Sequence, residues 1–308
     1  IKVIIEGGEE APGHLEKYVA AHPEFFSCDV MIIADNGNLA VGEPALTTTL
    51  RGEVSCIVEV RSLDHAVHSG SFGGAAPDAL VALIRILATL HDSDGNVAIE
   101  GLHSSPPPAT RYPEDLYQRN VGLLEGVELI GTGPLSARVW AKPSVTVIGI
   151  DAPPVRKASN TLIPRAAAKI SMRISPDADA GHELQLLMDH LRAAAPWDVH
   201  VEVMEVTKNS GFVCPKGGPG YAAARTALET AFGKAVGEIG AGGSIPLLDV
   251  LRAAVPAAEF ILWGAQDASC SRIHGTDESV DLGELERFIV AQSLVLQFLG
   301  KGEQIDQG

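Results

Sequence analysis

The order of elements predicted between residues 53 and 208 constrains the fold of this chain more than any other feature. Residues 54–62 alternate like a half-exposed strand, and residues 77–91 have the apolar spacing of an amphipathic helix. Further elements are predicted as strands at 144–150, 167–175 and 199–206, with a helix at 181–194. Strand, helix, two strands, helix, strand is the order of a ferredoxin-like α+β domain. We therefore expect 53–208 to be a separate, inserted domain.

An α/β pattern flanks this insert on both sides. Apolar runs at 3–5 and 29–35 indicate buried strands, with a helix at 14–21 between them. After the insert the predicted elements are helices at 220–232, 246–254 and 282–299, a strand at 258–263 and a flexible loop at 240–244. We expect residues 1–52 and 209–308 to form one discontinuous α/β domain. Residues 101–142 are predicted to be irregular, with one short helix near 113–119.

Composition narrows the possible partners and the compartment. With a net charge of −16 and no basic cluster, the chain does not suit nucleic acid, and no apolar run reaches the length of a membrane span. Its cysteines are widely spaced, which favours reduced, buried thiols in a cytoplasmic protein: Cys28, Cys56, Cys214 and Cys270. The chain begins at Ile1 without a methionine, and we expect it to be the remainder of a longer protein.

Carboxylates follow both of the first two predicted strands. Glu9 and Glu10 come after the strand at 3–5, and Asp35 follows the next strand. Open α/β sheets place their chemistry at the carboxyl ends of strands, and neighbouring residues there point in different directions. One glutamate can therefore ligate a metal while the other stays available as a general base. The alternatives are a solvated acidic turn for Glu9 and Glu10 and an Asx turn at Asp35.

Several stretches occur together in an order that resembles one enzyme family. They are Glu6-Gly-Gly-Glu-Glu10, Ile33-Ala-Asp-Asn36, Pro44 to Gly52, Asp64 to Gly74, Ser159 to Arg165, Ile170-Ser-Met-Arg173, Gly242-Gly-Ser-Ile-Pro246 and His274-Gly-Thr-Asp-Glu278. The chain is similar to the di-zinc metallopeptidases that include carnosinase, carboxypeptidase G, aminoacylase and succinyl-diaminopimelate desuccinylase. It most resembles the carnosinase-like dipeptidases.

The resemblance implies a two-metal centre and a fold. Glu10 and His274 would ligate one divalent ion and Asp35 the other, zinc being expected, while Glu9 would act as general base. Without this context His274 is an exposed loop histidine. The implied fold is a zinc-peptidase-type catalytic domain, truncated at its N-terminus, with the ferredoxin-like insert as a lid and dimerisation domain.

The resemblance also implies substrate-binding residues. His68 would reach into the active site of the partner subunit and stabilise the oxyanion, although it can also simply cap the following helix. Arg173 would bind the free carboxylate of the substrate, with Asn160 as a companion; Arg173 can also merely face solvent, and Arg165 is the weaker candidate. Gly243 and Ser244, at a helix start, offer N–H donors suited to a carboxylate.

The chain departs from this family in one respect. Relatives carry an upstream His-x-Asp and a later aspartate that bridges the metals, whereas none of the ten histidines here is followed by Asp two positions on. We therefore expect residues 1–308 to hold an incomplete site, to bind at most one ion tightly and to be inactive alone.

We predict a metal-dependent dipeptidase, or a related carboxypeptidase, that cuts an amide next to a free carboxylate and forms a homodimer through an edge strand or the first helix of the insert. The alternatives are an N-acyl amino-acid deacylase and a non-catalytic fragment that mainly dimerises. Metal content and turnover of dipeptides and of succinyl- or acetyl-amino acids distinguish the three.

Overall fold

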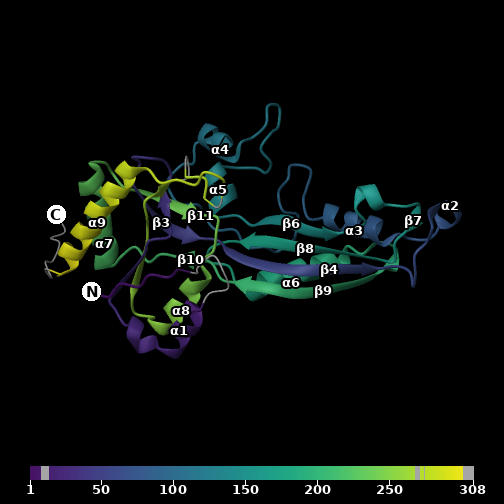
Figure 1. Cartoon of the computed structure of the whole chain (residues 1–308), viewed down its shortest axis with the longest axis horizontal. Coiled ribbons are helices and arrows are strands. Elements are labelled where there is room, and N and C mark those ends of the chain that lie inside the picture. The colour runs from purple at the N-terminus through teal and green to yellow at the C-terminus, as the bar shows by residue number, and fades with distance from the viewer. Residues whose placement is uncertain (8–13, 268–270, 274, 301–308) are drawn as a thin grey trace.

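Two β-sheets organise the computed structural model, which describes residues 1–7, 14–267, 271–273 and 275–300. A five-stranded sheet with helices around it lies at one end of the molecule, where both termini are found (Figure 1). A four-stranded sheet of long strands extends from it toward the opposite end. The molecule is consequently elongated.

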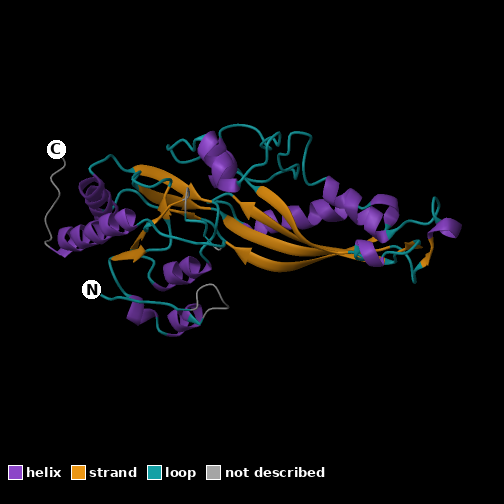
Figure 2. Cartoon of the chain, turned by 45° about the horizontal axis from the view of Figure 1, so that its top comes forward, coloured by secondary structure: helices purple, strands orange, loops and turns teal. Residues whose placement is uncertain are grey.

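The four-stranded sheet has the predicted ferredoxin-like arrangement. Its strands, in spatial order, are β6 (Ser144–Asp151), β8 (Arg165–Ile174), β4 (Gly52–Arg61) and β9 (His200–Asn209), and all neighbours are antiparallel. Two helices cover one face, α3 (Ala79–Ala88) against β8 and β4 and α6 (Ala180–Ala193) against β4 and β9 (Figure 2). Alternate residues of the strands, such as Val58, Ile170 and Met172, pack beneath these helices in one apolar core. The other face of the sheet is not covered by these helices.

Two details of this region differ from the sequence prediction. β4 is almost entirely buried instead of half exposed, because it is an inner strand between β8 and β9, and even Ser55 and Glu59 are buried. Helix α3 begins at Ala79, two residues later than predicted, because Asp78 is its N-cap and accepts a hydrogen bond from the Val81 N–H.

The five-stranded sheet belongs to the α/β part of the chain. Its strands are β1 (Val30–Ile33), β12 (Glu259–Leu262), β3 (Ala45–Leu50), β10 (Phe212–Val213) and β11 (Gly237–Ala241). β1 runs parallel to β12, and β11 runs parallel to β3. Because β3 continues through Arg51 directly into β4, the two sheets are joined by a single residue at this point.

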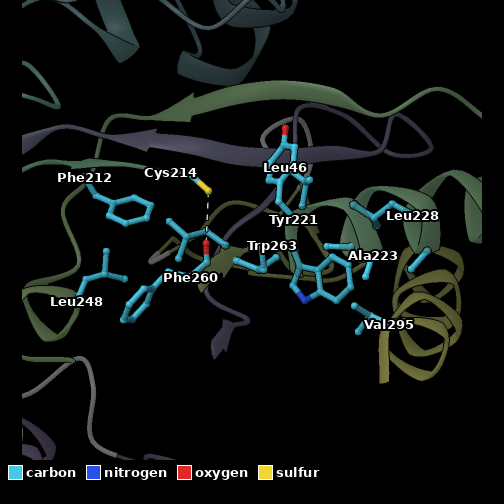
Figure 3. Packing of buried hydrophobic residues seen from close by; sticks show 14 of the residues in the cluster. Leu46, Phe212, Cys214, Tyr221, Ala223, Leu228, Leu248, Phe260, Trp263 and Val295 are labelled. Atoms are coloured by element: carbon cyan, nitrogen blue, oxygen red, sulfur yellow. Dashed lines mark hydrogen bonds between the residues drawn. The ribbon is translucent and has the colours of Figure 1, made fainter. Parts of the chain in front are cut away.

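Helices pack on different sides of this sheet (Figure 1). α7 (Pro219–Phe232) packs against α9 (Leu282–Gly300), and α1 (Leu15–Ala21) packs against α8 (Pro246–Ala254). Figure 3 shows the shared core, in which Trp263 and Val295 lie toward α7 and α9, and Phe260 and Leu248 toward α8. These elements confirm the helices and strands predicted at 14–21, 29–35, 220–232, 246–254, 258–263 and 282–299.

The strand predicted at residues 3–5 is wrong. These residues form no strand, and Val3 and Ile5 are 79% and 90% exposed. β1 is an edge strand, and among the described residues no strand pairs with its outer side. Without a neighbouring strand and a covering helix, an apolar β-branched run has nothing to bury it, whatever its propensity.

Short elements complete the structure, and some were not predicted. They are η1 (Pro23–Phe26), β2 (Gly37–Asn38), β5 (Val67–His68), α2 (Ser69–Phe72), α4 (Glu114–Val121), α5 (Leu135–Trp140), η2 (Val155–Lys157), β7 (Thr161–Leu162), η3 (Pro196–Asp198) and β13 (Gln266–Asp267). α4 confirms the short helix near 113–119, whereas α5 and β11 were missed. The loop predicted at 240–244 is reduced to 242–244, because β11 pairs with β3 as far as Ala241.

The described cysteines carry free thiols. Cys56 and Cys214 are buried, as predicted, and Cys214 donates a hydrogen bond to the Phe260 carbonyl oxygen (Figure 3). Burial raises the pKa of the Cys56 thiol to about 12 and that of Cys214 to about 11. Cys28 is only partly buried, and Cys270 lies outside the described residues. None of the described helices combines the length and the apolar character needed to cross a membrane.

Candidate metal and substrate site

Asp35 follows β1 by two residues and is exposed at the carboxyl end of that strand, where it was expected. The next residues form β2, which pairs in parallel with β13, just after β12. The backbones of the segments after β1 and after β12 lie very close together, since a Cβ on Gly264 would lie 2.1 Å from the Asn36 carbonyl oxygen. The segment that follows β1 therefore runs beside the segment that leads to His274.

A buried carboxylate holds the segment after Asp35 in place. Glu284, in the first turn of α9, is completely buried. Its two oxygens accept hydrogen bonds from Asn38 Nδ2 at 2.6 Å and from the Gly42 N–H at 2.7 Å. Asn38 Oδ1 accepts in turn from the Ala45 N–H at 2.8 Å, at the start of β3. This network fixes the carboxyl end of β1 against α9.

The other predicted residues of the metal centre, Glu9, Glu10 and His274, lie outside the described residues. On either side of His274 the chain is turned, with the Gly275 N–H donating to the Arg272 carbonyl oxygen at 2.7 Å. Within the described part of the chain, no three His, Cys, Asp or Glu side chains form a metal-holding group. Carboxylate and imidazole donors suit a divalent transition metal, and the β2–β13 pairing brings two of the expected segments together. The donor chemistry of residues 1–308 therefore fits such an ion, although the ligand roles remain predictions.

Arg173 lies near the end of β8 on the sheet face away from the helices. Glu53 is directly opposite on β4, and its carboxylate makes an ion pair with Arg173 at 3.4 Å while accepting from Ser171 Oγ at 2.9 Å. The Arg173 guanidinium also donates to Ser244 Oγ at 3.4 Å. The structure thus brings together two predicted substrate-binding residues, one from each sheet region. Gly243, beside Ser244, is exposed.

A second arginine, Arg51, reaches this junction and was not singled out from the sequence. It lies between β3 and β4, is 9% exposed and donates to Ser144 Oγ at 2.9 Å and to the Lys142 carbonyl oxygen at 3.3 Å. Ser144 is the direct strand neighbour of Arg173. Burial, and then the positive charge of Arg173, lower the pKa of Arg51 to about 10. A lone arginine in a strand linker gives no sequence signal of this proximity.

His68 and Asn160 come together at the opposite end of the molecule, near β7 and α2 (Figure 1). The Ser69 N–H donates to the Asn160 carbonyl oxygen at 2.9 Å, and the Gly70 N–H donates to His68 Nδ1 at 3.2 Å. The helix-capping role of His68 is therefore real, and it leaves Nε2 to carry the ring proton. The eight residue steps along β8 from Arg165 to Arg173 alone span about 26 Å. His68 consequently lies far from Arg173 of the same chain.

Arg165, the weaker candidate for substrate binding, lies at that distant end of β8. Its guanidinium bonds to the buried carboxylate of Glu59, which Arg61 also approaches at 3.4 Å. This neutralising network belongs to the uncovered face of the sheet and has no contact with Ser244. The geometry favours Arg173 over Arg165 as the arginine of the site.

Comparison with known families and structures gives a consistent picture. A family profile described as the M20 peptidase dimerisation domain matches residues 48–199, which include β4, β6, β8 and both covering helices. Human carnosine dipeptidase 1 is 23% identical in a structural alignment that covers 96% of this chain and 65% of that one, with a TM-score of 0.76. The overall fold is therefore that of the M20 peptidases.

Two curated relatives extend the match over nearly the whole sequence. A cysteinylglycine-S-conjugate dipeptidase from Corynebacterium striatum is 39% identical over 307 residues, which are 98% of this chain and 67% of the relative. A Beta-Ala-His dipeptidase from Rattus norvegicus is 29% identical, covering 100% of this chain and 66% of its own length. The chain thus spans about two thirds of the length of the curated relatives it matches.

Proposed function

Because this chain belongs to the M20 family of metallopeptidases, we propose that it serves the metal-dependent hydrolysis of dipeptides that end in a free carboxylate. The observation that carries this proposal is the similarity, over almost the entire chain, to a relative named as a dipeptidase. The contact between Arg173 and Ser244 supports it independently, since a guanidinium beside a hydroxyl suits the terminal carboxylate of a substrate. A deacylase has no comparable support among the curated relatives named above.

Each group of residues has a distinct role in this proposal. Glu10, Asp35 and His274 would hold divalent ions, which supply Lewis-acid polarisation of the scissile carbonyl when bound. Glu9 takes a proton from the attacking water and delivers it to the leaving amine. Arg173 holds the substrate carboxylate and so fixes the distance between that end and the scissile amide.

We further propose that His68, the predicted oxyanion residue, and Asn160, the predicted companion of Arg173, contact the substrate of the partner subunit in a dimer. His68, capped through Nδ1, presents an Nε2–H donor at the distant end of the sheet, where it is exposed. A donor about 26 Å or more along the sheet from Arg173 cannot serve the same chain's substrate. It can serve a partner's site if the sheets of two copies lie side by side.

One edge of the four-stranded sheet suits such pairing. β6 is an edge strand whose side chains Val147, Ile148 and Ile150 are 40% to 53% exposed, without a charge before Asp151. On the neighbouring helix α3, Val81 and Ile84 are also exposed. The opposite edge, β9, carries charged residues that discourage pairing: Glu202, Glu205 and Lys208. We therefore place the two-fold contact at β6 and α3, within the region that matches the dimerisation-domain profile.

Ile148→Lys is expected to convert a dimer into a monomer, because it places a charge in the middle of the proposed contact. Light scattering coupled to size exclusion at about 10 μM measures the mass. Val206→Lys is the matched control, since Val206 is 45% exposed on the charged edge strand β9, and this variant should remain dimeric. A monomeric wild-type chain, or equal effects of the two substitutions, would contradict the assignment.

A chain limited to residues 1–308 is expected to bind at most one divalent ion tightly and to be inactive. It supplies the three proposed ligands Glu10, Asp35 and His274, whereas a two-metal centre needs about three ligands for each ion. Zinc titration by calorimetry, followed by assays on Cys-Gly, β-Ala-His and N-acetyl and N-succinyl amino acids, tests the site and the substrate class. Two tight sites, or turnover, would show that these residues complete the site themselves. In an active protein that includes this chain, a preference for acyl amino acids over dipeptides would favour the deacylase.

A further inference from the structure

The junction between the two sheets holds more positive charge than its own residues neutralise. Arg51 and Arg173 approach the same two segments, the start of β6 and the loop at 242–244. A Cβ on Gly242 would lie 2.9 Å from an Arg51 terminal nitrogen, which places that guanidinium directly against the loop. Glu53 is the carboxylate that pairs with Arg173, and no described carboxylate pairs with Arg51. Two guanidiniums therefore lie at this junction, and the one described carboxylate there, Glu53, pairs with Arg173 alone.

Arg51 is unusual because it is both buried and incompletely bonded. It is 91% removed from solvent, and its bonded nitrogen donates only to the neutral Ser144 hydroxyl and a carbonyl oxygen. Its Nε–H is buried and makes no hydrogen bond within the described part of the chain. Burying a guanidinium without a carboxylate is costly, so a buried arginine with an unbonded Nε–H suits an anion that completes it. The depressed pKa of Arg51 reflects the same imbalance, although the residue remains charged at neutral pH.

Glu53 explains why a second cation is needed here. An incoming carboxylate that binds Arg173 also lies near the negative charge of Glu53, which is only 3.4 Å from that guanidinium. With Arg173 alone, the bound state would contain two carboxylates and one cation. With Arg51 included, two cations face two carboxylates and the charges balance. The balance is reached only when one external carboxylate is bound.

We propose that Arg51 is a specificity-determining residue that supplies the second positive charge for the terminal carboxylate of the substrate, next to Arg173 and Ser244. This inference rests on the proposed function, which assigns that carboxylate to Arg173. Arg51 holds its charge in place by donating to the Lys142 carbonyl oxygen just before β6 and to Ser144 Oγ at the start of β6, so the charge is present before the ligand arrives. It thereby makes the site selective for a free carboxylate over an amide.

The test compares two probes that differ only at this end, N-acetylglycine and N-acetylglycinamide, by saturation-transfer NMR on the full chain. Arg51→Gln keeps a hydrogen-bond donor for Ser144 but removes the charge, and should weaken N-acetylglycine binding about tenfold while changing that of the amide less than about twofold. Lys169→Gln is the matched control, because this exposed lysine lies on the same face of β8 as Arg173. Its loss should alter the binding of neither probe. Equal weakening of both probes, or no weakening, would overturn the proposal.

If thermal unfolding shows that Arg51→Gln fails to fold, a second variant tests the charge balance on which the proposal rests. Glu53→Gln leaves both arginines in place and removes the competing carboxylate, so N-acetylglycine should bind at least about threefold more tightly. Unchanged or weaker binding would contradict the charge balance. Dipeptide turnover, measured on an active protein that includes this chain, is a separate readout. If binding is selective for the carboxylate and depends on Arg51, but that protein shows no turnover, this inference stands and the proposed function is rejected.

Discussion

Glu9→Gln is expected to lower the turnover of a dipeptide by between about a hundredfold and ten-thousandfold in an active enzyme that includes residues 1–308. Glutamine has nearly the same shape as glutamate but cannot accept the proton of the attacking water. The metal content should stay nearly unchanged, because the proposal gives proton transfer to Glu9 and ligation to its neighbour. Steady-state kinetics at saturating substrate and elemental analysis of the same preparation measure the two quantities.

Glu10→Gln is the informative counterpart, since it should lose metal as well as turnover. Glu6→Gln serves as the matched control, because Glu6 lies in the same stretch and has no proposed role, so activity and metal content should be retained. Equal metal loss in the Glu9 and Glu10 variants would mean that the two roles are misassigned. Glu9 and Glu10 lie outside the described part of the chain, so their roles are distinguished by the kinetics and metal content of the variants.

The ferredoxin-like sheet could be predicted because each element carries its own signal. The helix α6, for example, has a regular apolar face formed by Leu184, Leu187 and Leu191, which are almost fully buried. The amphipathic patterns of α3 and α6 and the spacing of the strands then leave few possible topologies. What the local pattern does not contain is the position of a strand within the sheet. β4 was therefore predicted to be half exposed, although its neighbours β8 and β9 leave most of its residues buried.

Prediction failed where structure depends on partners distant in sequence. Residues 3–5 have strong strand propensity but no neighbouring strand in the described structure. β11 was missed for the opposite reason, since Gly237 and Gly240 are poor strand formers and pair only because β3 lies beside them. At Gly240 a Cβ would lie 2.6 Å from the Trp140 Cβ, so glycine is required by packing against α5.

The candidate site shows the same division. Arg173 and Ser244 were identified separately by resemblance, and the structure adds that they touch. Arg51 was not identified, because its role depends on Ser144 and Arg173, residues more than ninety positions away. The resemblance assigned His68 to the active site of a partner subunit, and His68 and Asn160 lie at the other end of the sheet from Arg173 of the same chain.

Arg173 is held in a position suited to selective binding. Ser244 Oγ and Glu53 both contact its guanidinium, and both come from elements other than β8, so its orientation is set by the surrounding structure. It remains partly exposed, which allows a ligand to reach it. A guanidinium presents parallel N–H groups that match the two oxygens of a carboxylate but not a carboxamide. In the proposed function, Arg173 can therefore distinguish a free carboxylate from an amide at the end of the substrate as well as bind it.

Arg173→Ala is accordingly expected to reduce kcat/KM for a dipeptide by between about thirtyfold and several thousandfold, since truncating one partner of such an ion pair costs about 2–5 kcal/mol. The C-terminally amidated dipeptide should change little, because it makes no ion pair with Arg173. Arg165→Ala is the matched control on the same strand and the same sheet face, and it should leave the ratio of the two substrates unaltered. The measurement is kcat/KM for both substrates in all three proteins, with thermal unfolding as a check on folding. An equal loss on the acid and the amide would mean that Arg173 supports the structure through Glu53 instead of recognising the carboxylate.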